Sequence, residues 1–161
     1  MAKTLDRASI LEGIKQYFDI EELVCDHMLE RWKDNPERCW DFLDTGFLAL
    51  LLMLRRDVIQ QPMYCNNHKK GVHQRGIRCN MCEMVKEKDY PYMSAHVLGK
   101  GGDFSVEGVS GVRAMDYIRK KIKLFSGMYP VSFRMEAGVS WLHIDVMPTP
   151  DGQNIYEFRA A

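Results

Sequence analysis

The chain has 161 residues, of which 46% are hydrophobic and 27% are charged, a balance typical of a globular protein with one continuous core. Its 22 basic and 22 acidic residues cancel, so the composition gives no electrostatic reason to expect nucleic acid or an anionic membrane as a partner. Five cysteines are an odd number, and without a secretory signal they do not suggest a disulfide scaffold.

The N-terminus carries charged residues with no apolar stretch behind them, which predicts that no secretory signal is present. The longest apolar run, from Phe47 to Leu54, is far shorter than the roughly 20 residues that span a bilayer. We therefore expect a soluble monomer that is made in the cytoplasm and has no membrane or nucleic-acid partner.

The first 60 residues are predicted to be helical. A first helix should begin after Asp19, because the apolar residues of the segment 20–28 recur at the spacing of one helix face. A second helix is expected at 39–42 and a third at 47–59, before Pro62. The third is apolar nearly all round, which predicts a central core helix.

The remaining residues change in character after Pro62. A long polar loop rich in Gly, Asn, His and Cys is expected as far as Asp89, and an amphipathic helix capped by Ser110 follows later. Alternating apolar and polar residues predict strands at 92–96, 102–106, 131–136, 139–146 and 155–158. We therefore predict a single α+β domain over residues 1–161, with N-terminal helices (1–60) packed on a small antiparallel sheet in the part that carries the metal site (61–161).

Two segments, 94–103 and 141–145, carry the residue types of a catalytic zinc site. Such a site takes three protein ligands and leaves one position open, and His96, Asp103 and His143 supply two imidazoles and one carboxylate. A glycine-rich turn before Asp103 would let the chain fold back, and alternation within the second segment places His143 opposite an apolar strand face. These residues are the predicted Zn²⁺ ligands.

The same residues resemble a known family. The pattern Ser-x-His-x-x-Gly-x-small-x-Asp, followed by Trp-x-His-x-Asp, is similar to the motifs of the zinc D-Ala-D-Ala carboxypeptidases and of the phage endolysins that cut L-alanyl-D-glutamate bonds. The resemblance covers roughly residues 60–158. It implies a hedgehog/D-Ala-D-Ala peptidase-like fold, zinc as cofactor and peptidoglycan stem peptides as substrate. Because a cytoplasmic product without a signal needs a holin, a virion or cell lysis to reach the cell wall, we also expect a phage-encoded protein.

The resemblance also implies roles in substrate binding. An arginine upstream of the first motif commonly holds a substrate carboxylate in this family, and Arg78 or Arg75 lies in that region. An arginine or Ser94 would help to stabilise the oxyanion. Trp141 of the second motif is a further candidate for contact with the substrate.

The catalytic base departs from the family pattern. Many members carry a Glu three residues before the second histidine, where this chain has Ser140. Asp145, on the strand face of His143, is one candidate, although it could equally orient that histidine. Glu136 is the other; a two-residue hairpin turn would leave it roughly 13 Å from His143, and a different turn would bring it closer. The choice between the two acids stays open at this stage.

Cysteine and histidine pairs in the loop after Pro62 are typical of a structural zinc site, with free thiols as the equal alternative. The predicted ligands are Cys65, His68, Cys79 and Cys82. A metal there would hold the loop that carries Arg75 and Arg78. Outside the loop, Cys25 and Cys39 are expected to be buried free thiols, and His27 an ordinary surface residue.

Two functions from other classes remain alternatives. The chain could be a non-catalytic phage structural or binding protein that keeps the peptidase fold, which the serine at position 140 favours. It could also be a zinc-stapled interaction module centred on residues 65–82, with the C-terminal motifs serving only for packing.

Overall fold

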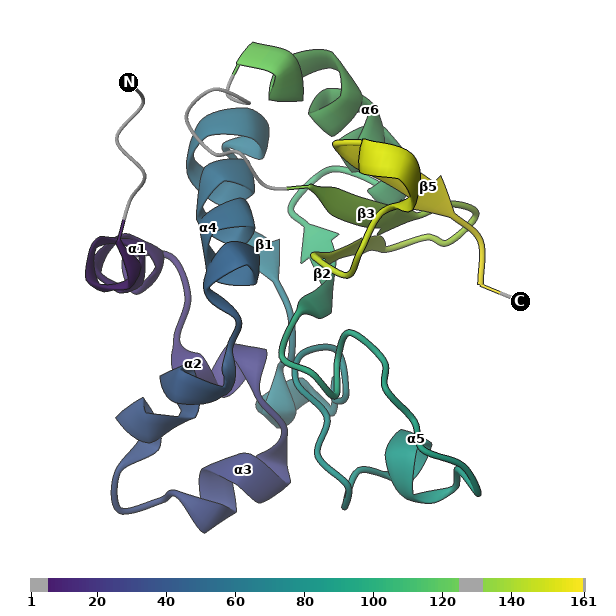
Figure 1. Ribbon diagram of the computed structural model, residues 1–161. Helices are drawn as coiled ribbons and strands as arrows, with labels where there is room; N and C mark the ends of the chain where they lie inside the picture. The colour runs from purple at the N-terminus through teal and green to yellow at the C-terminus, as the bar shows by residue number, and fades with distance from the viewer. Residues whose placement is uncertain (1–5, 125–131, 161) are drawn as a thin grey trace.

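A computed structural model describes residues 6–124 and 132–160 of the chain (Figure 1). The described part is helical in its N-terminal half, and its C-terminal half combines one longer helix with a sheet. The helical segments are α1 (Arg7–Ile14), α2 (Ile20–Leu23), α3 (Asp26–Arg31), η1 (Pro36–Phe42), α4 (Thr45–Met53), η2 (Leu54–Ile59), η3 (His68–Lys70), α5 (Glu83–Lys86), α6 (Gly111–Lys121), η4 (Ile122–Leu124) and η5 (Pro150–Gly152).

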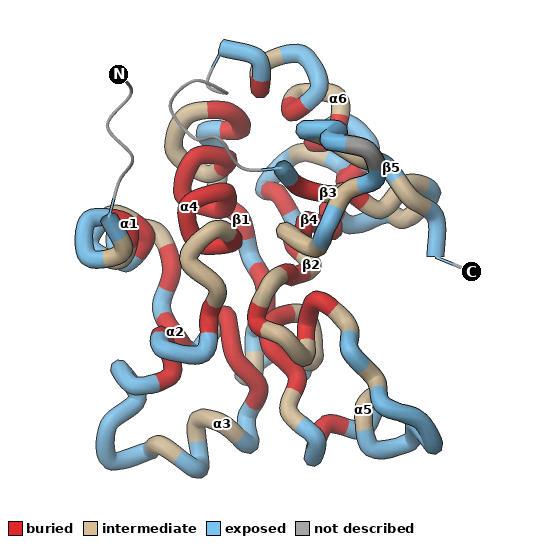
Figure 2. Tube along the Cα trace, viewed as in Figure 1, coloured by how far each residue is buried: buried red, intermediate tan, exposed pale blue. Residues whose placement is uncertain are grey.

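Helix α4 is the central core helix that its composition predicts. It begins after Asp44, whose side chain accepts the backbone N–H groups of Gly46 and Phe47. Every residue from 47 to 53 is buried, which Figure 2 shows in red. The helical path continues through η2 and ends shortly before Pro62, so the predicted third helix is confirmed.

The long first helix expected from the sequence is instead divided into α2 and α3. Val24 and Cys25 between them have extended backbones. The carbonyl of Leu23 accepts the N–H of Ile77, and the carbonyl of Val24 accepts a hydrogen bond from the side chain of Asn66. Because the loop after β1 takes these carbonyls, they cannot accept intrahelical bonds, and tertiary contacts override the helical periodicity.

The described strands form one sheet in the order β1-β2-β4-β3-β5. Their bounds are β1 (Met63–Tyr64), β2 (Gly101–Val106), β3 (Phe133–Glu136), β4 (Leu142–Asp145) and β5 (Ile155–Phe158). Neighbours are antiparallel except for β3 and β5, which are parallel. The molecule is therefore an α+β protein, but its sheet is mixed rather than antiparallel as predicted, because the chain returns through η5 to the outer edge of β3.

One strand prediction is wrong, and another extends beyond the described residues. Residues 92–96 form no strand; they lead into a turn over residues 95–99 that closes when Leu98 donates its N–H to the carbonyl of Ser94. The first residue of the strand predicted at 131–136, Val131, lies outside the described residues.

The sheet has an apolar face and a polar face, as alternation along β4 predicts. Leu142 and Ile144 are fully buried and belong to the same hydrophobic cluster as residues of α4 and α6. Helix α6, capped by the side chain of Ser110, packs against β2, β4 and η2. The side chain of His143, which lies between Leu142 and Ile144 on β4, points to the opposite face of the sheet. Within the described residues, no helix is both long and apolar enough to cross a membrane.

Candidate functional site

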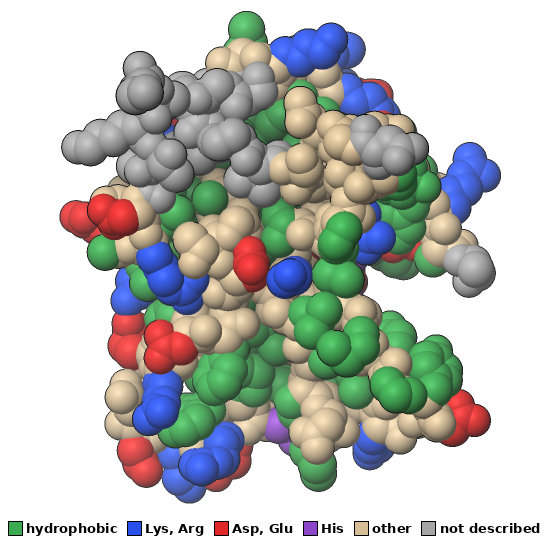
Figure 3. Space-filling view, viewed as in Figure 1, with side chains coloured by type: hydrophobic (Ala, Val, Ile, Leu, Met, Phe, Trp, Pro, Cys, Tyr) green, Lys and Arg blue, Asp and Glu red, His purple; other side chains and the backbone are tan. Residues whose placement is uncertain are grey.

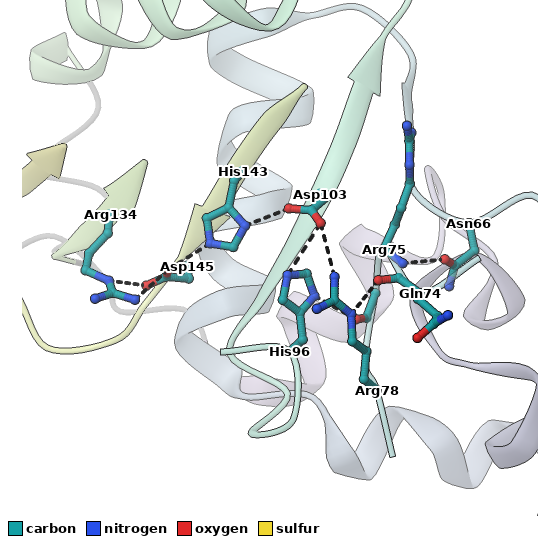
Figure 4. A network of polar contacts seen from close by, with 10 residues as sticks. Asn66, Gln74, Arg75, Arg78, His96, Asp103, Arg134, His143 and Asp145 are labelled. Atoms are coloured by element: carbon teal, nitrogen blue, oxygen red, sulfur yellow. Dashed lines mark hydrogen bonds and ion pairs between the residues drawn. The ribbon is translucent and has the colours of Figure 1, made fainter. Parts of the chain in front are cut away.

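The three predicted zinc ligands meet on the polar face of the sheet (Figure 4). Asp103 of β2 pairs in register with His143 of β4, and His96 comes from the turn that precedes β2. His143 Nδ1 lies 2.6 Å from Asp103 Oδ1, and His96 Nε2 lies 3.5 Å from Asp103 Oδ2. One ligand atom from each residue lies within 4.8 Å of the other two. The structure thus brings together side chains from two distant segments.

The glycines of the first motif allow this close approach. Gly99 has a φ of +66°, which favours glycine, and a Cβ atom there would lie 2.0 Å from the carbonyl oxygen of Phe42. Gly101 faces Asp145 across the β2–β4 pair, and a Cβ atom there would lie 2.6 Å from the Cβ of Asp145. A side chain at Gly101 would push β2 away from β4, and one at Gly99 would push the turn away from Phe42, so either would disturb the placement of the ligands.

The hydrogen bonds of the two histidines leave one ring nitrogen of each facing Asp103. His96 Nδ1 lies 2.9 Å from the carbonyl oxygen of Gly76, so Nδ1 is the donor and Nε2 faces the carboxylate. His143 Nε2 lies 2.9 Å from Asp145 Oδ2, which leaves Nδ1 facing Asp103. Histidine ligands of metals usually donate their other N–H to a carbonyl or a carboxylate in this way.

The donor set therefore fits a zinc ion. Tetrahedral zinc with bonds of about 2.0 Å separates its nitrogen and oxygen ligands by about 3.3 Å. The 3.5 Å between His96 Nε2 and Asp103 Oδ2 is close to that value. The contact between His143 Nδ1 and Asp103 Oδ1 is shorter and has the length of a hydrogen bond.

Neighbouring charges and burial shift the pKa values of the three residues in different directions. Burial by itself lowers the pKa of His143, but hydrogen bonds and charges from Asp103 and Asp145 outweigh it and raise the pKa to about 9. Burial lowers the pKa of His96 to about 4, against the opposing charge of Asp103. Burial also disfavours the Asp103 carboxylate, yet its contacts with the histidines and Arg78 lower its pKa overall. Asp103 and Asp145 thus favour positive charge at His143.

Asp145 has the geometry of a residue that orients His143. It is 0% exposed and accepts two hydrogen bonds from Arg134, at 2.7 and 2.9 Å, and one from the backbone of Met147. With the contact to His143 Nε2, both carboxylate oxygens are fully engaged. Arg134 was not among the predicted site residues, although its alternation with Glu136 along one strand places both on the same face.

Glu136 lies on β3, next to the strand of His143, and both residues line the same cleft. The β3–β4 pairing joins Arg134 to Asp145 and Met135 to Ile144, so the same register continued by one residue brings Glu136 to His143. Cβ atoms of directly opposed residues are about 5 Å apart, far less than the separation that a two-residue turn would impose. The connection between the strands covers residues 137–141, and this longer turn is the alternative that brings the acid closer.

A cleft of about 490 Å³ opens beside the three ligands, and Figure 3 shows the molecule hollowed between the regions of α5 and β5. Arg78, Ser94, Glu136 and Trp141 all line it. Arg78 is only 6% exposed, and its guanidinium lies 3.5 Å from Asp103 Oδ2. The structure therefore places every predicted substrate-binding residue at the cleft except Arg75, whose guanidinium bonds to Ser105 instead.

A second group of ligand types lies away from this cleft, and it differs from the prediction. The atoms of Cys25, His27, Cys79 and Cys82 lie within 4.8 Å of one another, a cluster that could bind a metal. We call these four residues the Cys3His cluster. Two predicted members, Cys79 and Cys82, belong to it, and two do not. The spacing of the cysteines along the chain identified the Cys-x-x-Cys pair, but it did not identify Cys25 and His27 at the start of α3 as the partners of that pair.

Cys65 and His68 are the members that the structure excludes. Cys65 follows β1 and is buried in the hydrophobic core. His68 Nδ1 lies 2.6 Å from Asp26 Oδ1, and His73 Nδ1 lies 3.2 Å from the other oxygen of that carboxylate. In their place stand Cys25, predicted as a free thiol, and His27, predicted as an ordinary surface residue. His27 is exposed, but its Nδ1 lies 3.8 Å from Cys82 Sγ.

We compared the chain with models of protein families, with curated proteins and with solved structures, and none of the three comparisons gave a match. The fold and these groups therefore define the molecule as an α+β protein with a His–Asp–His cluster in a cleft and a Cys3His cluster outside it. A third group, Asp26, His68 and His73, also has its ligand atoms within 4.8 Å of one another.

Proposed function

We propose that the chain is a zinc-dependent hydrolase of peptidoglycan peptides, a carboxypeptidase or endopeptidase of the endolysin type with a hedgehog/D-Ala-D-Ala peptidase-like fold. The observation that carries the proposal is the convergence of His96 Nε2, His143 Nδ1 and the Asp103 carboxylate beside an open cleft. These are the residues of the two motifs on which the family resemblance rests.

His96, Asp103 and His143 would hold the zinc ion. When bound in such a site, zinc supplies a Lewis acid that polarises a peptide carbonyl and lowers the pKa of a water molecule. Asp145, held by Arg134, keeps the His143 ring in the tautomer that leaves Nδ1 free for a metal.

Glu136 is the general base in this proposal. It lines the cleft with the three ligands, and it is half-buried, so water can reach its carboxylate. Asp145 is unsuited to the role because Arg134, Met147 and His143 already occupy its oxygens. Glu136 would take a proton from the attacking water and deliver it to the leaving amine.

The cleft suits a short peptide that carries a carboxylate. Its volume of about 490 Å³ is within the usual range for small-molecule sites. Arg78 donates Nε–H to the carbonyl of Gln74, and this contact orients the rest of its guanidinium towards the cleft. A fixed guanidinium can bind a carboxylate of a stem peptide, while Ser94 and Trp141 contact the remainder.

The test is mass spectrometry of purified peptidoglycan after incubation with the zinc-loaded chain. We expect released peptides whose new termini identify the bond, and we expect a chelator to stop their release. The Glu136→Gln variant should keep its zinc and lose cleavage, which separates the base from the ligands. A wild-type chain that holds zinc at His96, Asp103 and His143 but leaves every stem peptide intact would refute the proposal.

That same outcome would support the second candidate function, a non-catalytic phage structural or binding protein with a peptidase fold. The observation in its favour is Ser140, which stands where many family members carry their catalytic Glu. Binding of the zinc-loaded chain to intact peptidoglycan, without release of peptides, would distinguish it from a hydrolase. An interaction module would instead depend on the Cys3His cluster alone.

A further inference from the structure

We infer that Cys25, His27, Cys79 and Cys82 form a closed zinc site that ties the start of α3 to the loop that carries Arg78. The inference is independent of the proposed hydrolase function, because none of the four residues lines the cleft beside His96, Asp103 and His143.

The distances within the Cys3His cluster fit one tetrahedral ion. Zinc–sulfur bonds of about 2.3 Å place two sulfurs about 3.8 Å apart, and a sulfur and a nitrogen about 3.6 Å apart. Cys79 Sγ and Cys82 Sγ are 3.9 Å apart, and Cys82 Sγ lies 3.8 Å from His27 Nδ1. A disulfide would require about 2.05 Å between two sulfurs, and all of these cysteines are free thiols.

The backbone around the cysteines is arranged for sulfur ligands. Cys82 donates its N–H to the carbonyl of Cys79, which closes the Cys-x-x-Cys turn and points both side chains to one side. Met81 donates its N–H to Cys79 Sγ at 3.4 Å, a contact that holds the sulfur in place. On the other segment, the extended backbone at Cys25 interrupts the helical path between α2 and α3 and turns the residue towards the loop.

The choice of ligands indicates the ion and its role. Thiolates and imidazole together favour zinc over the hard cations magnesium and calcium, which take oxygen ligands. Four protein ligands leave no open position for water or substrate, and such closed sites are structural. The site therefore stabilises the fold and does not itself perform chemistry.

The segment that the ion would hold has little regular structure of its own. Between β1 and β2 the described chain forms only the short helices η3 and α5. Loops of this length without secondary structure are uncommon in compact domains, and a bound metal ion is one way to keep such a loop ordered. Because Arg78 precedes Cys79 directly and its guanidinium reaches Asp103, an ion at the Cys3His cluster would fix the loop at one wall of the cleft.

Zinc content of the purified full-length chain tests the inference directly. We expect Cys79→Ser to lose about one equivalent of zinc per chain relative to the wild type, the share of one closed site. Cys39→Ser is the control, since Cys39 is a thiol outside the cluster and is more deeply buried than Cys79, and this variant should keep its zinc. Equal zinc in Cys79→Ser, Cys39→Ser and the wild type would overturn the inference.

Cobalt substitution separates the two centres by spectroscopy. A cysteine-ligated cobalt ion shows a sulfur-to-metal charge-transfer band, whereas a site of histidine and aspartate has no sulfur ligand. We expect the band in the wild type and in His143→Ala, and we expect its loss in Cys79→Ser. A wild-type chain that binds cobalt without this band would refute the Cys3His site and leave the hydrolase proposal standing. A wild-type chain that shows the band but does not cleave peptidoglycan would refute the hydrolase proposal and leave the Cys3His site standing.

Substitutions at His27 guard against a variant that simply fails to fold. His27 is exposed, so neither His27→Ala nor His27→Cys disturbs the core. We expect His27→Ala to release zinc to a chelator at least about tenfold faster than the wild type, because one of four ligands is lost. His27→Cys restores a four-ligand set and should retain the metal. Identical zinc release from all three proteins would contradict the inference.

Discussion

The His–Asp–His cluster and the Cys3His cluster belong to differently built parts of the molecule. His96, Asp103 and His143 lie on or beside paired strands, and hydrogen bonds from Gly76 and Asp145 already orient both imidazoles. The Cys3His cluster joins the first turn of a short helix to an irregular loop, and its side chains contact mainly one another. The backbone therefore preorganises the first cluster, whereas an ion would have to organise the second.

The charge of the two clusters differs in the same way. Around His143, Asp103 and Asp145 raise its pKa to about 9, so a proton satisfies the carboxylates when no metal is bound. Around Cys82, burial raises the thiol pKa to about 12, so without a cation the sulfur stays protonated and neutral. The cleft should keep its shape without a metal, and the loop should not. The predictions that follow test this difference.

The largest expected effect is that of Asp103→Ala. It removes a ligand and the carboxylate that holds both histidines, so peptide release should fall below detection and zinc at the cleft should be lost. Elemental analysis together with the peptidoglycan digest checks both results. The charge-transfer band of cobalt at the Cys3His cluster should persist in this variant, and its disappearance would mean that the two centres are not independent.

The next effect is that of Glu136→Gln, which should lower kcat by about 10²- to 10⁴-fold, the usual contribution of a general base. Zinc content should not change, because Glu136 is not one of the three ligands. Steady-state kinetics on a soluble stem peptide, with elemental analysis alongside, gives both values. A decrease of less than about tenfold would argue against Glu136 as the base.

Removal of metal by a chelator should loosen the loop more than the sheet. We expect hydrogen exchange at residues 77–82 to accelerate by about 100-fold, corresponding to roughly 2.7 kcal/mol of lost linkage when zinc is present at about 100 times its Kd. Exchange at β2 and β4 should change much less, because the strands pair without an ion. Equal acceleration in both regions would remove the distinction between the two clusters.

The smallest of these effects is expected for Asp145→Asn. The change weakens the partner of His143 and leaves Arg134 without its carboxylate, so zinc affinity at the cleft should fall by about 10- to 100-fold. Competition with a chromogenic chelator measures the affinity. Zinc at the Cys3His cluster should be unaffected, and Cys39→Ser serves as the control for a substitution at a buried side chain.

Several features of the fold could be predicted from local sequence. The apolar segment of α4 had to be buried whatever its neighbours, and Asp19 and Ser110 carry capping side chains whose effect depends only on the next few residues. The parallel pairing of β5 with β3 could not be predicted, because it depends on where a distant strand edge remains free. Zinc, the peptidoglycan substrate, the monomeric state and the phage origin stay predictions.

The two sequence motifs predicted which residues could bind one ion in the cleft. The two glycines of the first motif and the alternation along β4 are local properties, and they position His96, Asp103 and His143 in the predicted way. The partners of these residues and of the cysteines depend on how distant segments pack together. Strand pairing set Glu136 next to the strand of His143, and the packing of α3 against the loop joined Cys25 and His27 to Cys79 and Cys82. Both depend on contacts between segments far apart in the chain, for which spacing within either segment carries no information.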